Sequence, residues 1–149
     1  HATWLRERPG DYQAQVRSRY EPGLYMPATT YLRALDVRVK LLRDFSDKVF
    51  SKADVLHTPG LSMPVPSLAD SDVAAGQGMA EMVARLSWTT RSNNYLGIPS
   101  LAVPCGFTAS GLPVGLHIVG RHRKETTVIL ASAAFEEARP WRDARPAIS

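Results

Sequence analysis

Residues 94–120 decide the fold class, and they read NYLGIPSLAVPCGFTASGLPVGLHIVG. Two apolar runs in this stretch, Leu101–Pro104 and Val114–Val119, have the length and the residue types of strands. Gly106 and the group at 111–113 supply the turn between them, because glycine and proline favour the backbone conformations that reverse a chain. The stretch therefore predicts a hairpin of two strands.

A long helical pattern precedes this hairpin. Residues Thr29–Phe50 carry apolar side chains at intervals of three and four, which places these side chains on one stripe of a helix. The stripe consists of Leu32, Leu35, Val39, Leu42, Phe45 and Val49. On the polar side, Asp36 with Lys40 and Asp44 with Lys48 have the spacing of i,i+4 ion pairs.

Shorter elements complete the pattern. Residues Asp54–Thr58 predict a strand, Gln77–Thr90 a helix and Lys124–Ala138 a final helix, while residues 69–78 predict a mobile connection. Because helices and strands interleave, the sequence predicts an α/β fold, with helices flanking a mixed sheet.

The composition is that of a folded domain. The chain has 149 residues, of which 44% are hydrophobic and 21% charged, and this balance argues against disorder. No run of about 18 apolar residues predicts a membrane span. The net charge of +4 comes without a basic stripe interleaved with aromatic residues, so we expect no nucleic-acid partner. The single Cys105 rules out an internal disulfide and fits the reducing cytoplasm, which is the expected location.

A resemblance to a known family rests on two linked motifs. Asn-x-x-Gly-x-Pro at 94–99, followed by Gly-Leu-Pro-x-Gly-Leu at 111–116, resembles the C-terminal block of amidase-signature enzymes. This family includes broad amidases, the A subunit of glutamyl-tRNA(Gln) amidotransferase, and allophanate- and malonamide-type hydrolases. The likeness continues through residues 31–59 and 124–141. It implies that residues 1–149 are a C-terminal fragment of an amidase domain, and a chain that opens on His1 is expected of such a fragment.

The resemblance also implies a chemistry. In the family, one serine attacks the amide carbonyl, a second serine relays protons to a lysine, and backbone N–H groups stabilise the oxyanion. The glycine- and serine-rich segment that carries these serines is absent from this sequence, so no catalytic residue is assigned here. We expect the catalytic residues to lie outside this chain, and the chain alone to hydrolyse no amide. No metal or organic cofactor is implied.

Three residues are candidates for substrate binding: Trp88, Asn94 and His117. Glutamine-specific relatives place an acidic residue near Ser87, and its absence here favours a neutral or aromatic amide, on which Trp88 could stack. The alternative for Trp88 is a buried tryptophan of a helix. Asn94 could instead hold a turn by bonding neighbouring backbone. Relatives often carry glutamine where His117 stands, and a histidine there could donate a hydrogen bond or titrate near neutral pH.

Two other classes of function stay open. Cys105 and His117 lie on the two strands of the predicted hairpin, so they could approach as the nucleophile and base of a thiol hydrolase. The alternative for Cys105 is a small core residue. The chain could also be a noncatalytic binding or assembly module, whose exposed apolar surface would favour self-association as a homodimer. The four histidines lack the spacing of a zinc site, so no metal is expected.

Overall fold

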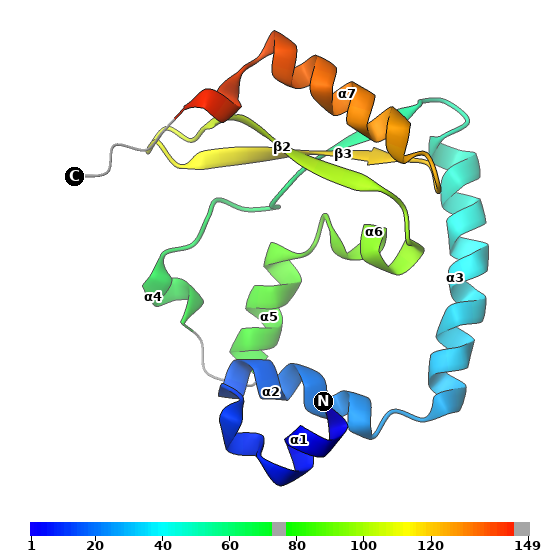
Figure 1. The fold of residues 1–149 in the computed structure, drawn as a ribbon, viewed down its shortest axis with the longest axis vertical. Coiled ribbons are helices and arrows are strands. Elements are labelled where there is room, and N and C mark those ends of the chain that lie inside the picture. The colour runs from blue at the N-terminus through cyan, green and yellow to red at the C-terminus, as the bar shows by residue number, and fades with distance from the viewer. Residues whose placement is uncertain (73–76, 145–149) are drawn as a thin grey trace.

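A three-stranded antiparallel sheet organises the structure, a computed structural model that describes residues 1–72 and 77–144 (Figure 1). Its strands are β1 (Val55–Pro59), β2 (Ser100–Phe107) and β3 (Pro113–Gly120), in the order β1-β3-β2. The predicted hairpin is therefore confirmed as β2 and β3, and the central strand β3 also pairs with the much earlier β1. The α/β class is confirmed as well, but within the described residues the sheet is antiparallel rather than mixed.

Two backbone irregularities shape the hairpin. A β-bulge between Pro104 and Gly106 shifts the register, so that Cys105 has no partner in β3. At the turn, Gly111 has a φ of 82°, in the left-handed region that glycine adopts without steric cost. The turn is closed by the N–H of Thr108, which donates to the carbonyl of Leu112 at 2.8 Å.

One face of the sheet is covered by α7 (Glu125–Ala138). Val128 of α7 forms a buried cluster with Val103 and Ile118 of the sheet. The strand residues Val55, Leu101 and Leu116 and the helix residues Ala131 and Phe135 pack around this cluster. Beyond α7, the short helix η3 (Trp141–Asp143) places the Trp141 ring 5.9 Å from Phe107 in an edge-to-face contact. The predicted final helix is thus confirmed.

On the opposite face, the described residues form a buried cluster at one end. Val119 of β3 packs there against Leu96 and Ile98, with Leu42 and Phe45 beside them. The last two belong to α3 (Ala28–Val49), and Leu96 ends α6 (Arg91–Leu96). The prediction of one helix over 77–90 is wrong at its end, because α5 (Gln77–Leu86) stops four residues earlier, and α6 was not predicted.

The long helix α3 confirms its prediction to within one residue at each end, but its apolar stripe is not uniformly buried. Leu42 and Phe45 pack against the core, whereas Leu32 is 57% exposed and Val39 is 61% exposed. The sheet begins only where α3 ends, so the first half of the stripe has no sheet to pack on (Figure 1). The predicted ion pair of Lys40 with Asp36 is not formed, because Lys40 instead pairs with Asp44 at 2.8 Å.

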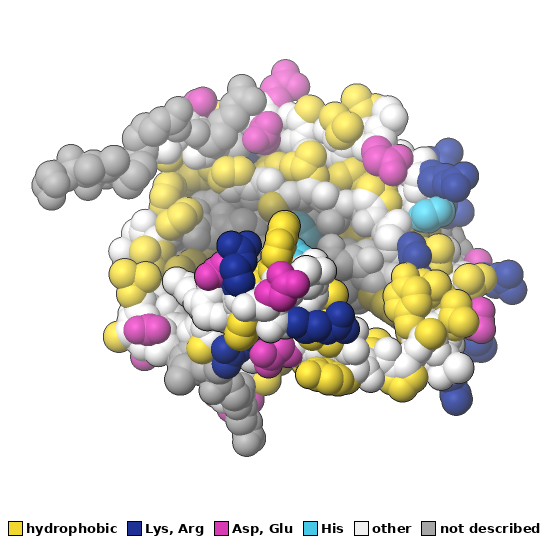
Figure 2. Space-filling view, turned by 60° about the horizontal axis from the view of Figure 1, so that its bottom comes forward, with side chains coloured by type: hydrophobic (Ala, Val, Ile, Leu, Met, Phe, Trp, Pro, Cys, Tyr) yellow, Lys and Arg dark blue, Asp and Glu magenta, His cyan; other side chains and the backbone are white. Residues whose placement is uncertain are grey.

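The N-terminal helices lie at the end of the molecule away from the sheet (Figure 1). These elements are α1 (Ala2–Glu7), η1 (Pro9–Asp11), α2 (Ala14–Tyr20) and η2 (Glu21–Leu24). Stacking of His1 on Tyr20, with centroids 4.9 Å apart, holds them together. Between them and the sheet the molecule is hollowed (Figure 2).

The connection predicted over 69–78 starts within α4 (Leu68–Ser71), and residues 73–76 lie outside the described part of the chain. In the described residues, no helix combines the length and apolar character that crossing a membrane requires.

Candidate functional site

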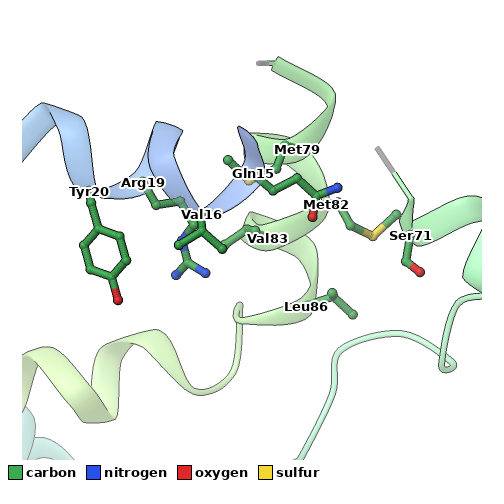
Figure 3. Close-up of a pocket in the computed structure, with 9 residues that line it drawn as sticks. All are labelled: Gln15, Val16, Arg19, Tyr20, Ser71, Met79, Met82, Val83 and Leu86. Atoms are coloured by element: carbon green, nitrogen blue, oxygen red, sulfur yellow. The ribbon is translucent and has the colours of Figure 1, made fainter. Parts of the chain in front are cut away.

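A cavity of about 450 Å³ lies between α2 and α5 (Figure 3). Helix α5 contributes four apolar side chains, Met79, Met82, Val83 and Leu86. The other lining residues are Gln15, Val16, Arg19 and Tyr20 of α2 and Ser71 of α4. The volume and the mixture of apolar wall and few polar groups are those of small-molecule sites.

The chemistry of the lining suits an apolar group with a polar end. Methionine side chains are flexible and polarisable, so Met79 and Met82 can adapt to irregular shapes. Arg19 and Tyr20 bring hydrogen-bond donors from α2, on the other side of the cavity (Figure 3). The spacing of the apolar residues of α5 was visible in the sequence. That these residues face α2 across a cavity was not.

Trp88 follows α5 and does not line this cavity. Its side chain is 75% exposed, so its alternative interpretation as a buried helix tryptophan is wrong. The backbone N–H of Trp88 donates to the carbonyl of Arg85 at 3.4 Å, which places the residue just beyond the end of α5. An exposed indole can still stack on an aromatic group.

Asn94 lies within α6 rather than in a turn, and its side chain is exposed. Its neighbour Asn93 is the buried amide instead, at 6% exposure. The carbonyl of Asn93 accepts the N–H groups of Gly97 and Ile98, at 2.9 and 3.2 Å, and so ends the helix. The turn-holding role expected of Asn94 is therefore wrong, and sequence reasoning missed Asn93.

His117 lies on the sheet face opposite α7. Its register partners are Thr58 in β1 and Ala102 in β2. In the part of the chain that the structure describes, neither Nδ1 of His117 nor Oγ1 of Thr58 has a hydrogen-bond partner, although both atoms are buried. Burial lowers the pKa of His117, which favours the neutral imidazole.

The structure does not gather the three sequence candidates into one site. Trp88 follows α5, Asn94 lies in α6 and His117 lies in β3, and none of the three lines the cavity between α2 and α5.

The structure also separates Cys105 from His117. The register partner of His117 is Ala102, three residues before Cys105, which at the rise of a strand is a separation of about 10 Å. The Cys105 thiol instead donates to the carbonyl of Val114 at 3.5 Å. The thiol–histidine pair is therefore not formed. Residues 1–72 and 77–144 also contain no group of three or more His, Cys, Asp or Glu side chains that could hold a metal ion.

Sequence comparisons relate almost the whole chain to an amidase and to A subunits of glutamyl-tRNA(Gln) amidotransferases. A family model described as Amidase matches residues 4–129. An amidase of Pseudomonas putida is 34% identical over 147 residues, which cover 98% of this chain and 31% of that protein. The A subunit of the glutamyl-tRNA(Gln) amidotransferase of Methanosarcina barkeri is 36% identical over 153 residues, which cover 98% of this chain and 30% of that protein.

Solved structures agree with this relation. A crystal structure of an amidase superposes with a TM-score of 0.75 at 29% identity, covering 93% of this chain and 31% of that one. A bacterial aryl acylamidase of the amidase signature family superposes with a TM-score of 0.68 at 27% identity, covering 96% and 31%. The fold and the sequence thus define a protein of the amidase-signature class.

This chain belongs to the amidase family. It spans about a third of the length of the curated relatives that it matches.

Proposed function

We propose that this chain is the C-terminal third of an amidase that hydrolyses a carboxamide to an acid and ammonia or an amine. The observation that carries the proposal is the match of 98% of the chain to 31% of the Pseudomonas putida amidase. The superposition on an amidase structure with a TM-score of 0.75 supports it. The motifs at 94–99 and 111–116 support the C-terminal position, because they resemble the last block of the family.

In this proposal, the reaction takes place on residues of the remaining two thirds of the fold. A serine hydroxyl is a weak nucleophile until a neighbouring base takes its proton, and the Ser–Ser–Lys arrangement of the family supplies that base. Backbone N–H groups then stabilise the negative oxygen of the tetrahedral intermediate. This chain would contribute the supporting sheet and helices and one wall of the substrate pocket.

The cavity between α2 and α5 is the proposed binding site for the apolar part of the substrate. Its four apolar side chains on α5 favour a neutral or aromatic substituent, and the exposed Trp88 follows the same helix. An aryl acylamidase among the structural relatives is consistent with an aromatic amide. Asn94 and His117 do not line this cavity. In this proposal they would contact substrate only at a site that other elements of the assembled enzyme complete.

A chimera tests this function. The segment of the Pseudomonas putida amidase that matches this chain is replaced by residues 1–149, and hydrolysis of benzamide and acetamide is measured for the chimera and for the chain alone. We expect the chimera to hydrolyse at least one amide and the chain alone to show no rate above buffer. Hydrolysis by the chain alone would contradict the proposal, and so would a cooperatively folded chimera without activity.

A noncatalytic assembly module is the second candidate. The observation in its favour is the sheet face opposite α7, where the described residues form a buried hydrophobic cluster at the end beside α3 and α6. One of the relatives is itself part of a glutamyl-tRNA(Gln) amidotransferase. A folded, inactive chimera would favour this candidate. Cytoplasmic location and homodimer formation stay predictions.

A further inference from the structure

Three buried polar atoms from three different elements have no hydrogen-bond partner in the described residues. They are Oγ1 of Thr58 in β1, Nδ2 of Asn93 in α6 and Nδ1 of His117 in β3. A fourth, Nε of Arg38, belongs to a guanidinium group that already donates to the carbonyl of Leu96 at 3.4 Å. Buried polar atoms nearly always have a partner, because leaving one unpaired costs stability. The three atoms therefore need a partner in common or one each.

Thr58 and His117 lie side by side on the sheet face opposite α7. They are register partners in the antiparallel pair of β1 and β3. Side chains alternate between the two faces of a strand, so Thr58 points to the same face as Leu56. His117 likewise points to the same face as Val119. Because Leu56 and Val119 both pack in the cluster around Leu96, the two unpaired atoms lie next to that cluster.

The segment that leads into α6 runs along these two strands, on the side of the sheet away from α7 (Figure 1). At one end, the Thr89 hydroxyl donates to the carbonyl of Gly60 at 3.4 Å, and the N–H of Gly60 donates to the carbonyl of Gly115 at 2.8 Å. At the other end, Leu96 packs against β3. Asn93 is buried, and it shares one side of α6 with Leu96 because the two residues are three positions apart. Its amide therefore lies between the two contacts, beside the unpaired atoms of the sheet.

The three atoms complement one water molecule. The Asn93 Nδ2 group can only donate, so it needs an acceptor. Burial lowers the pKa of His117 and favours the neutral ring, whose Nδ1 accepts when Nε2 carries the proton. A water molecule can accept from Asn93, donate to His117 and bond the Thr58 hydroxyl in either sense, which gives it the three partners typical of an internal water. A cation would meet the N–H donors of Asn93 instead.

We propose that Thr58, Asn93 and His117 bind one internal water molecule, which ties α6 to the centre of the sheet. The site is separate from the cavity between α2 and α5, and it does not depend on the proposed function. It still bears on that cavity, because only residues 87–90 separate α6 from α5, whose Leu86 lines the cavity wall. By anchoring α6, the water also anchors the end of the helix that forms this wall.

Water contacts in NMR spectra of the isotope-labelled chain test the site. We expect a cross-peak between water and the side-chain amide protons of Asn93, with the sign of a bound rather than a freely exchanging water. Thr58→Val keeps the shape of the side chain and removes the hydroxyl. It should abolish this cross-peak and speed hydrogen exchange of the α6 amides by about tenfold. Thr58→Ser keeps the hydroxyl and should preserve both properties.

The matched control is His57→Gln. His57 pairs with Ile118 in the same sheet, and its exposed side chain is on the face that carries α7, so the cross-peak and the exchange rates should stay unchanged. The proposal is overturned if the parent chain shows no bound-water cross-peak at Asn93, or if the cross-peak survives in Thr58→Val. A scalar coupling across a direct hydrogen bond from Asn93 Nδ2 to His117 Nδ1 would also overturn it. The parent spectrum decides alone if Thr58→Val does not fold, and an inactive amidase chimera would leave this test standing.

Discussion

His117 shows that the surroundings of a side chain in the folded structure need not be visible in its sequence motif. In the motif it is one position of a glycine-rich strand. In the structure it stands opposite Thr58, with its Nδ1 atom buried and unpaired among the described residues. The residue type was visible in the sequence. The lack of a partner depends on β1, which precedes it by about sixty residues, so no local pattern could predict it.

The lowered pKa of His117 predicts a pH dependence of the isolated chain. Below the ordinary pKa of about 6.5, the unfolded chain binds a proton that the folded chain resists, because burial disfavours the charged imidazole. Stability is therefore fully present above about pH 6.5 and decreases as the pH falls from there towards the folded pKa. We expect urea unfolding to have a lower midpoint at about pH 5.5 than at about pH 7.5.

The control for this pH dependence is a pair of variants. His117→Gln should reduce the difference between the two pH values, and His57→Gln should leave it as it is. An equal difference in the parent chain and in His117→Gln would show that other groups cause it. Asp44 is not expected to interfere, because its hydrogen bond with Lys40 lowers the pKa of the carboxyl below 3.8, outside this pH range.

At the scale of elements, predictability followed the strength of the local signal. The hairpin was predicted because glycine and proline mark its turn, and α3 because its period is long and regular. Helix α6 was missed because Ser92, Asn93 and Asn94 are residues that compete with the helix for backbone hydrogen bonds. Tertiary contacts stabilise it instead, with Leu96 buried against α3 and Ile98.

The junction after α6 gives a test at this scale. Gly97 has a φ of 69°, and a Cβ atom there would also collide with the guanidinium group of Arg38. We expect Gly97→Ala to reduce the free energy of unfolding by about 1–2 kcal/mol, since alanine resists the left-handed conformation. Urea denaturation of the isolated chain measures it.

A second glycine provides the control for Gly97. Gly78 is the second residue of α5, with nothing within 4 Å of an added Cβ, so Gly78→Ala should raise stability by at most about 0.5–1 kcal/mol. If Gly97→Ala and Gly78→Ala changed stability in the same direction, the strain argued for Gly97 would be wrong.

At the scale of the whole molecule, the candidate site is formed by segments that lie far apart in the sequence. The α2–α5 cavity joins residues that lie more than fifty positions apart, such as Val16 and Met79. Periodicity identified the apolar face of α5, but the partner of that face depends on how α3 spans the distance between the N-terminal helices and the sheet (Figure 1). The candidate site was therefore predictable in its residue types and not in its assembly.

The uncovered half of the α3 stripe predicts self-association of the isolated chain. Leu32 and Val39 are large apolar side chains exposed on one helix, and such surfaces favour contacts between molecules. We expect the sedimentation coefficient to rise with concentration. The double variant Leu32→Lys with Val39→Lys should reduce this rise.

A matched double variant separates apolar contact from charge. Thr29→Lys with Thr30→Lys adds the same charge on the same helix and removes no large apolar side chain. It should self-associate like the parent chain. A sedimentation coefficient that does not depend on concentration in the parent would contradict the prediction of a homodimer.

The strand order β1-β3-β2 also has a consequence for the timing of folding. During synthesis β1 is completed long before β3, which is the strand that pairs with both of its neighbours. Until β3 begins to leave the ribosome, neither β1 nor β2 has the strand with which it pairs in the described residues. The hairpin can then form at once, whereas the addition of β1 must first close a long loop, which slows that step. The earliest strand of this chain is thus the last to join the sheet.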